Sequence, residues 1–245
     1  MEHIKINKSL YINANCLFIM QKMIQNNEMV DCIIVDPPYG INHHSNRRKD
    51  KKNSITKKGI INDNNNQELL KQAIDLSYQC LKNNSHIYWF TRWDKLEEQL
   101  PMLRNYYNIK NVLIWDKCNH GSGDLTGAYG NRYECIIYGM KGRRDLNKID
   151  GKQRHDDILT YSKVPAQKLI HPHQKPIGLL EFLILKSTNE GDIILDMFAG
   201  VGSTLVAAIK NKRECIAIEL DSNIYKKGKE RLNNEGLKLH IYKVS

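Results

Sequence analysis

The chain has 245 residues, enough to bury a large core within a single α/β domain. It carries 37 Lys and Arg against 27 Asp and Glu, and this net charge of +10 favours a polyanionic partner such as nucleic acid. Six widely spaced cysteines without a C-x-x-C pair argue against a disulfide framework or a zinc cluster. No apolar run approaches the roughly 20 residues of a membrane helix, and the N-terminus lacks a signal-peptide core, so we expect a soluble protein with no membrane partner. The cysteine pattern favours a cytoplasmic location and no metal site.

Short apolar runs rich in β-branched and aromatic residues alternate with longer segments of helical spacing. This alternation predicts one α/β domain over residues 1–245, built on a doubly wound, mainly parallel sheet. The predicted strands are 9–13, 31–35, 85–90, 111–115, 134–139, 192–196, 214–219 and 238–243. The predicted helices are 17–26, 67–82, 94–105, 176–188, 203–211 and 222–233.

Asp36, Pro37, Pro38 and Tyr39 follow the apolar run Cys32–Val35. An acid at the carboxyl end of a strand stands where open α/β sheets bind their ligands. Two prolines hold the backbone extended, so Asp36 and the Pro37 carbonyl could both accept hydrogen bonds from a primary amine. Tyr39 offers an aromatic face for a stacked, flipped-out base. These four residues are the predicted catalytic residues, and the alternative is a D-P-P turn that simply ends a strand.

Two polar stretches interrupt the alternation. The first, at about 41–66, is a predicted surface loop with seven Lys and Arg between positions 43 and 58. A solvated insertion is one interpretation, and the place of the loop directly after the Asp36 motif raises the case for contacts with phosphates. The predicted DNA contacts are Arg47, Arg48, Lys49, Lys51 and Lys52. The second stretch, at about 117–171, is polar and glycine-rich at its start and basic from Lys141 to Arg154.

A second strand-to-helix turn is predicted from Asp196 to Thr204. Gly200 and Gly202 allow close approach of a nucleotide-like ligand, and a helix start offers N–H donors. Glu219 ends the next strand about 20 residues further on, where an acid typically binds ribose hydroxyls. A nicotinamide dinucleotide also fits, but Asp196 favours the cationic amino-acid end of S-adenosylmethionine. The predicted cofactor-binding residues here are Asp196, Phe198, Gly200, Gly202, Ser203 and Glu219.

The motifs D-P-P-Y and F-A-G-V-G-S, in this order, resemble those of the β group of DNA amino-methyltransferases, the N4-cytosine and N6-adenine family. The resemblance extends from Leu10 to about Leu232. It implies a Rossmann-like, S-adenosylmethionine-dependent methyltransferase fold that is circularly permuted, with a short target-recognition insertion at 117–171. Duplex DNA is the implied partner, and a homodimer is one assembly that the family implies.

Two further segments are similar to this family. His171-Pro172-His173-Gln174-Lys175-Pro176 resembles the H-P-x-Q-K-P that precedes the cofactor motif, which implies that Lys175 binds the cofactor carboxylate. Asn15 stands where many members have an aspartate near the cofactor adenine, and an amide can still bind that ring. The two histidines beside Lys175 lack further ligands, which argues against a metal site.

The resemblance implies that a methyl group passes from S-adenosylmethionine to a base flipped out of duplex DNA, without a covalent enzyme intermediate. Asp36 and the Pro37 carbonyl would orient and polarise the amine. Asp rather than Ser at position 36 favours adenine N6 over cytosine N4, which remains an alternative. Another alternative is a non-catalytic DNA-binding subunit, against which the intact motifs argue. The recognition sequence depends on base-edge contacts set by loop geometry, and restriction-modification, phage self-modification and regulatory methylation all use this chemistry.

Overall fold

The computed structural model describes residues 2–38, 66–120, 127–171 and 174–243. The strands within these ranges are β1 (Glu2–Ile6), β2 (Ser9–Asn13), β3 (Val30–Val35), β4 (Leu81–Thr91), β5 (Asn108–Asp116), β6 (Tyr133–Lys141), β7 (Ile158–Thr160), β8 (Ile193–Asp196), β9 (Glu214–Glu219) and β10 (His240–Lys243). The α-helices are α1 (Cys16–Gln25), α2 (Asn66–Cys80), α3 (Leu96–Arg104), α4 (Ile177–Ser187), α5 (Ser203–Lys210) and α6 (Ser222–Asn234), and the 3-10 helices are η2 (Trp93–Lys95) and η3 (Ala166–Lys168).

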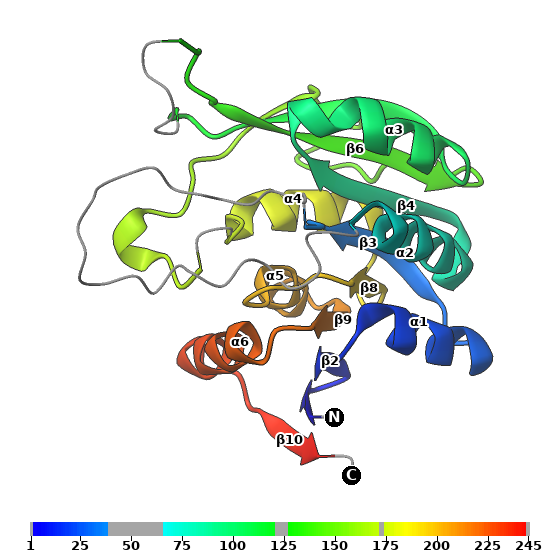
Figure 1. The fold of residues 1–245 in the computed structure, drawn as a ribbon, viewed down its shortest axis with the longest axis vertical. Coiled ribbons are helices and arrows are strands. Elements are labelled where there is room, and N and C mark those ends of the chain that lie inside the picture. Colours follow the sequence, from blue (N-terminus) through cyan, green and yellow to red (C-terminus); the bar gives the residue numbers. More distant parts are fainter. Residues whose placement is uncertain (1, 39–65, 121–126, 172–173, 244–245) are drawn as a thin grey trace.

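The described strands form one ten-stranded sheet in the order β10-β1-β2-β9-β8-β3-β4-β6-β5-β7 (Figure 1). The central strands from β2 to β4 are parallel to one another. Antiparallel pairs join β1 to β10 and β2, and join β6 to β4 and β5. The predicted α/β class and the mainly parallel sheet are therefore confirmed.

Helices cover both faces of this sheet (Figure 1). The helices α1, α2 and α3 pack on one face, where Met20 and Ile74 belong to one buried cluster. The helices α4, α5 and α6 pack on the other, where Leu183 belongs to a second cluster. Ile33 lies in the first cluster and Ile34 in the second, because successive side chains of a strand point to opposite faces. The sheet is thus doubly wound, as predicted.

The predicted strands and helices all occur, with ends shifted by a few residues. The helix predicted to reach residue 82 ends at Cys80, because Leu81 already pairs with Val30 of β3. The helix predicted over 94–105 is divided into η2 and α3. Two short strands, β1 and β7, were not predicted. The strand β7 has only three residues. The strand β1 lies next to the edge strand β10, and charged and apolar residues alternate in it.

The strands β3 and β8 are neighbours, with Cys32 paired to Ile194 and Ile33 to Leu195. From β3 the chain passes through α2 to β4 on one side, whereas from β8 it passes through α5 to β9 on the other. This divergence opens a crevice at the carboxyl ends of the two strands, which is where open α/β sheets bind ligands. Asp36 directly follows β3 and Asp196 ends β8, so both stand at this crevice.

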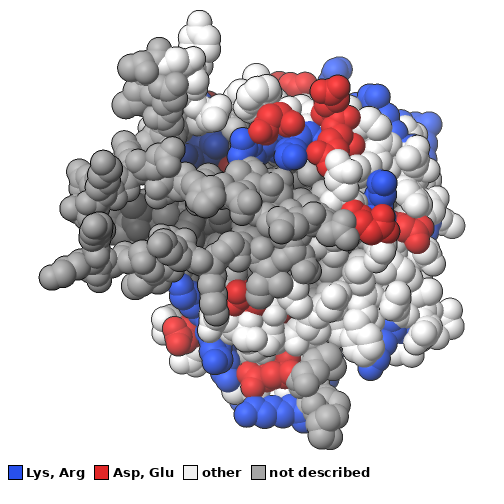
Figure 2. All heavy atoms as spheres, in the orientation of Figure 1, with Lys and Arg blue, Asp and Glu red and all other residues white. Residues whose placement is uncertain are grey.

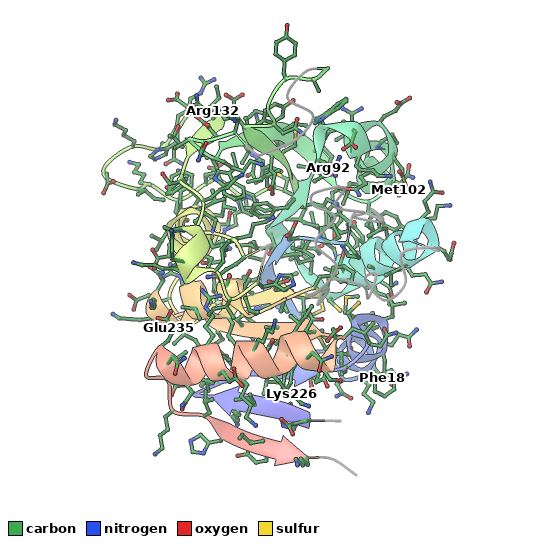
Figure 3. The ribbon with its side chains drawn as sticks, turned by 60° about the vertical axis from the view of Figure 1, so that its left-hand side comes forward. Phe18, Arg92, Met102, Arg132, Lys226 and Glu235 are labelled. Atoms are coloured by element: carbon green, nitrogen blue, oxygen red, sulfur yellow. The ribbon has the colours of Figure 1, made fainter. Side chains whose placement is uncertain are left out.

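The charges that the structure describes are mixed in sign on the face seen in Figure 2. Arg92 and Arg132 lie toward one end of the molecule, and Lys226 and Glu235 lie on or beside α6 (Figure 3). Both arginines are paired, Arg92 with Asp94 and Arg132 with an acid that ends β5. The net charge of +10 is therefore not gathered into one described patch on this face.

Three predictions about organisation have a more limited outcome. Within the predicted target-recognition insertion, residues 133–141 form β6 and belong to the sheet, while the recognition role of the insertion remains a prediction. The single domain over 1–245 and the circular permutation also remain predictions. In the described part of the chain, no helix is both long and apolar enough to cross a membrane.

Candidate active site

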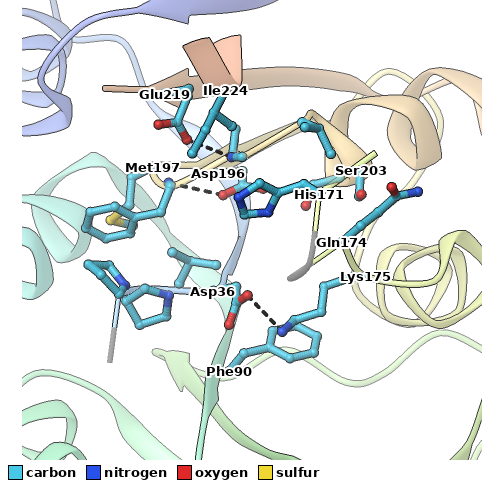
Figure 4. A pocket seen from close by; sticks show the side chains of 18 of the residues that line it. Asp36, Phe90, His171, Gln174, Lys175, Asp196, Met197, Ser203, Glu219 and Ile224 are labelled. Carbon is cyan, nitrogen blue, oxygen red and sulfur yellow. Dashed lines mark hydrogen bonds and ion pairs between the residues drawn. The ribbon is translucent and has the colours of Figure 1, made fainter. Parts of the chain in front are cut away.

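A cavity of about 830 Å³ lies at the carboxyl ends of β3 and β8. Its wall brings together most of the predicted site residues, namely Asn15, Asp36, Pro37, Pro38, Lys175, Asp196, Phe198, Gly200, Ser203 and Glu219. Figure 4 shows the side chains of Asp36 and Asp196 in one view of this cavity. Tyr39 and the predicted DNA contacts Arg47, Arg48, Lys49, Lys51 and Lys52 lie outside the described residues.

The Asp36 carboxylate is paired with a buried lysine. Its Oδ2 atom lies 2.7 Å from Nζ of Lys175, and the same Nζ lies 2.8 Å from Oε2 of Glu134 (Figure 4 shows the first contact). Pro37 is buried beside Asp36, so the backbone of this turn is held against the end of β3. The turn therefore presents an oriented carboxylate to the cavity.

Lys175 lines the cavity but is largely buried. It is only 8% exposed, and its Nζ lies 5.1 Å from the ring centroid of Phe90 and 5.6 Å from that of Trp115. Burial alone would lower the pKa of Lys175, but Asp36 and Glu134 raise it above its ordinary value. The lysine is thus a partner of Asp36, and its implied contact with a cofactor carboxylate remains a prediction.

Two glycines shape the turn after β8. Gly200 and Gly202 have φ values of +53° and +75°, which L side chains rarely adopt. A Cβ atom at Gly200 would meet no heavy atom of the described residues within 4 Å. The backbone conformation, rather than crowding inside the protein, therefore requires glycine at Gly200, and space remains beside it. Gly202 is the N-cap of α5 and, unlike Gly200, is not among the residues that line the cavity.

Two acids flank this turn, the buried Asp196 and the partly buried Glu219. The backbone N–H of Phe198 donates to Oδ1 of Asp196 at 3.2 Å, and that of Gly200 donates to Oε2 of Glu219 at 2.9 Å. A further backbone donor, Asp221, lies 2.7 Å from Oε1 of Glu219. Burial raises the pKa of both acids to about 7. A positive charge in the cavity would favour their ionised forms.

Side chains of other elements support the β8 turn through hydrogen bonds. The Tyr11 hydroxyl donates to the carbonyl of Gly200 at 2.6 Å, and Arg231 donates to the Ser203 hydroxyl at 2.8 Å. Asn15 caps α1, where its side chain accepts a hydrogen bond of 2.8 Å from the first turn. These contacts give Ser203 and Asn15 structural roles, and their binding to a cofactor remains a prediction.

Sequence reasoning missed Glu134 and Lys117. Both line the cavity, and Nζ of Lys117 lies 3.4 Å from Oε1 of Glu134. Lys117 directly follows β5, whereas Glu134 is the second residue of β6. A charge after an apolar strand, the signal that singled out Asp36 and Glu219, therefore points to Lys117 but not to Glu134, which precedes its apolar run. His171 also lines the cavity, and the described residues contain no group of three or more His, Cys, Asp and Glu that could hold a metal ion.

The fold and this site define a Rossmann-like α/β protein with a cavity at the point where the strand connections diverge, which is where proteins of this class bind their ligands. The chain belongs to the DNA methylase family, because the family model of that description, for the N6 and N4 type, matches residues 30–230. The predicted family resemblance is therefore confirmed.

Individual relatives agree with this family. Type II methyltransferase M2.MboI of Moraxella bovis is 30% identical, over 92% of this chain and 87% of its own length. DNA adenine methyltransferase YhdJ of Escherichia coli strain K12 is 28% identical, over 84% of this chain and 77% of its own. A crystal structure of an M1.HpyAVI–SAM complex has the same fold, with a TM-score of 0.72 and 24% identity over 91% of this chain and 98% of that one.

Proposed function

We propose that this protein transfers a methyl group from S-adenosylmethionine to the N6 amino group of adenine in duplex DNA. The observation that carries the proposal is the single cavity shared by the Asp36 turn and the turn between Asp196 and Glu219. One turn presents acceptors for an amine, and the other presents glycines and two acids for a nucleotide-like ligand. Membership of the DNA methylase family and the name of the relative YhdJ support the same reaction.

The residues of the β8 turn fit S-adenosylmethionine. Asp196 and Glu219 are buried and partly buried acids, respectively, whose pKa values are raised to about 7, so a ligand with a positive charge and hydroxyl donors would complement them. Open space beside Gly200 allows a ligand to approach the backbone. When bound, S-adenosylmethionine supplies a methyl group made electrophilic by its sulfonium.

The target amine is assigned to the β3 turn. The Asp36 carboxylate and the Pro37 carbonyl would accept hydrogen bonds from the two amine hydrogens and so fix the direction of the nitrogen lone pair. Positioning of this kind supplies a large part of the catalysis in a direct group transfer. The aspartate at position 36 favours adenine over cytosine, and Tyr39 is proposed to stack on the flipped base.

Contacts with DNA phosphates are proposed for Arg47, Arg48, Lys49, Lys51 and Lys52. Their replacement by glutamine should weaken DNA binding and flatten its dependence on salt, because each phosphate contact contributes a slope of about −0.9 in log K against log salt. Replacement of Lys226 and Lys227 on α6 by glutamine is the matched control. If both sets of variants show the wild-type slope, this segment does not contact phosphates.

The reaction is tested by expressing the protein in a host without DNA methylation and sequencing plasmid DNA with a method that distinguishes N6-methyladenine from N4-methylcytosine. We expect N6-methyladenine at a fixed sequence context. N4-methylcytosine would overturn the choice of base, and cofactor binding without any methylation would favour the non-catalytic subunit. We also propose a homodimer, from the family resemblance, and a cytoplasmic location, from the cysteine pattern. Sedimentation and fractionation experiments test these two proposals.

A further inference from the structure

Four charged side chains form a continuous row along the wall of the cavity. Asp36 lies 2.7 Å from Lys175, Lys175 lies 2.8 Å from Glu134, and Glu134 lies 3.4 Å from Lys117, each measured between charged atoms. The four residues come from separate segments: the turn after β3, the segment before α4, the start of β6 and the residue after β5. The proposed function uses only the first member of this row.

The two lysines of the row are buried. Lys175 is 8% exposed and Lys117 is 7% exposed. An ammonium group that leaves water loses several kcal/mol of solvation, which only a well-placed carboxylate offsets. Glu134 is the carboxylate that the two lysines share, one on each oxygen. Its removal would leave Lys175 with Asp36 as its carboxylate partner in this row.

The balance of charge favours ionised groups along the row. Burial alone would raise the pKa of Glu134, but Lys175 and Lys117 hold it below its ordinary value. The Lys175 ammonium also lies 5.1 and 5.6 Å from the ring centroids of Phe90 and Trp115. Among the contacts of this ammonium that the structure describes, those with Asp36 and Glu134 are the shortest.

We propose that Glu134 is a positioning residue for methyl transfer, which through Lys175 holds the Asp36 carboxylate in the orientation that the target amine requires. Lys117 fixes the second oxygen of Glu134 and so limits rotation of that carboxylate. The inference rests on the proposed role of Asp36. The competing explanation is that Glu134 only neutralises buried charge and contributes to stability.

Steady-state kinetics separate these explanations. Glu134→Gln should lower kcat by about 10- to 100-fold, because a displacement near 1 Å at a reacting group costs up to about 100-fold. The KM for S-adenosylmethionine should change less than about twofold, and Glu134→Asp should recover part of the rate. A purely structural role predicts a lower Tm with kcat unchanged for the folded fraction, and that result would overturn the proposal.

A matched control is available in the pair of Glu235 and Lys210. The distance from Nζ of Lys210 to Oε2 of Glu235 is also 2.8 Å. Glu235 follows α6 and is not among the residues that line the cavity, and Figure 3 shows it away from Arg92, which does line the cavity. Glu235→Gln should leave kcat and KM at their wild-type values. A loss of rate equal to that of Glu134→Gln would mean that removing any paired carboxylate has this effect, which would overturn the proposal.

A double-mutant cycle tests whether Glu134 acts through Lys175. In a Lys175→Met background, the further change Glu134→Gln should cause no additional loss of kcat. The double variant keeps the net charge of the row unchanged, so it is the reference variant if Lys175→Met alone does not fold. In that case, the double variant is compared with Glu134→Gln and wild type. Losses that multiply would show that Glu134 acts independently of Lys175.

Side-chain ammonium NMR gives a measurement that needs no activity. A held ammonium exchanges its protons slowly, so Lys175 should give a sharp Nζ signal, assigned by its absence in the double variant. This signal should shift and broaden in Glu134→Gln and persist in Glu235→Gln. An unchanged signal in Glu134→Gln would overturn the inference even if kcat falls. If the wild-type protein methylates no DNA, the proposed function fails, and this signal still decides whether Glu134 positions Lys175.

Discussion

The turns after β3 and β8 belong to neighbouring strands, yet their acids are paired in different ways. Asp36 faces the ammonium of Lys175 at 2.7 Å. Asp196 and Glu219 instead accept hydrogen bonds from backbone N–H groups, and burial raises their pKa values to about 7. The protein thus supplies a counter-ion at the β3 turn, whereas at the β8 turn we propose that a bound cationic ligand supplies it. On this proposal, the β3 turn positions the target amine and the β8 turn binds the cofactor.

The largest expected effect follows from Asp36→Asn, which keeps the size of the side chain but places an amide beside the Lys175 ammonium. Methyl transfer should fall by at least about 10²- to 10³-fold, the scale seen when one oriented polar group of an active site is lost. The Kd for S-adenosylmethionine, measured by calorimetry, should stay within about threefold of wild type. A comparable weakening of cofactor binding would remove the proposed division of labour between the turns.

Glu219→Gln tests the other turn. A glutamine offers one acceptor oxygen where Glu219 now accepts from the N–H groups of both Gly200 and Asp221. The Kd for S-adenosylmethionine should rise by about 10- to 100-fold, equivalent to the roughly 1.5–3 kcal/mol of a hydrogen bond to a charged group. At saturating cofactor, kcat should fall far less than in Asp36→Asn. Equal losses of kcat in the two variants would contradict the comparison.

Gly228→Ala tests the contact of Tyr11 with the β8 turn. A Cβ atom at Gly228 would lie 2.8 Å from Cζ and 2.9 Å from Cε1 of Tyr11, whose ring also stacks on Tyr225 at 4.6 Å. The ring has little room to move, and its hydroxyl donates to the carbonyl of Gly200. The free energy of unfolding should therefore fall by about 1–3 kcal/mol, as for other overpacked sites.

The control for Gly228→Ala is Gly178→Ala, also within a helix, where a Cβ atom would make only ordinary contacts, the nearest at 3.5 Å from Tyr161. It should be neutral or slightly stabilising in a denaturant titration, because alanine restricts the unfolded chain. If Gly228→Ala also leaves stability unchanged, Tyr11 does not fix the turn. The Kd of Gly228→Ala for S-adenosylmethionine, compared with that of Asp36→Asn, would then show whether displacement of the Tyr11 ring changes cofactor binding at the β8 turn.

What the sequence could predict differs in a similar way between the two turns. The places of Asp36 and Asp196 follow from local patterns, since each adjoins an apolar strand, and the structure has both strands within one residue of the predicted bounds. Glycine at 200 and 202 likewise follows from the left-handed backbone that the turn requires.

The contact between Lys175 and Glu134 was not predictable in this way. It depends on the antiparallel pairing of β4 with β6, which brings the start of β6 beside the end of β4, and no local pattern encodes that strand order. The same holds for the supporting contact of Tyr11 with Gly200, which joins residues 189 positions apart. Local sequence thus predicts which charged groups follow the apolar strands, and tertiary order decides which of them are neighbours.

The smallest expected effect is a change in bound protons at the β8 turn. The pKa values of Asp196 and Glu219 are raised from 3.8 and 4.5 to about 7, so between about pH 4 and pH 7 the folded protein holds protons that the unfolded chain has released. Their contribution to stability is fully present below pH 4 and is lost as the pH rises through 7. The free energy of unfolding without cofactor should therefore decline over this interval.

A cationic cofactor would reverse part of this proton uptake, because a positive charge near a carboxyl lowers its pKa. Binding of S-adenosylmethionine at pH 7 should release up to about one proton, since groups that titrate near 7 are about half protonated there. The release is measured as the difference in binding enthalpy between two buffers with different ionisation enthalpies. It should shrink in Asp196→Asn and persist in Asp36→Asn. Equal release in wild type and Asp196→Asn would mean that the cofactor does not meet the β8 acid, and the contrast between the two turns would then rest on Asp36 alone.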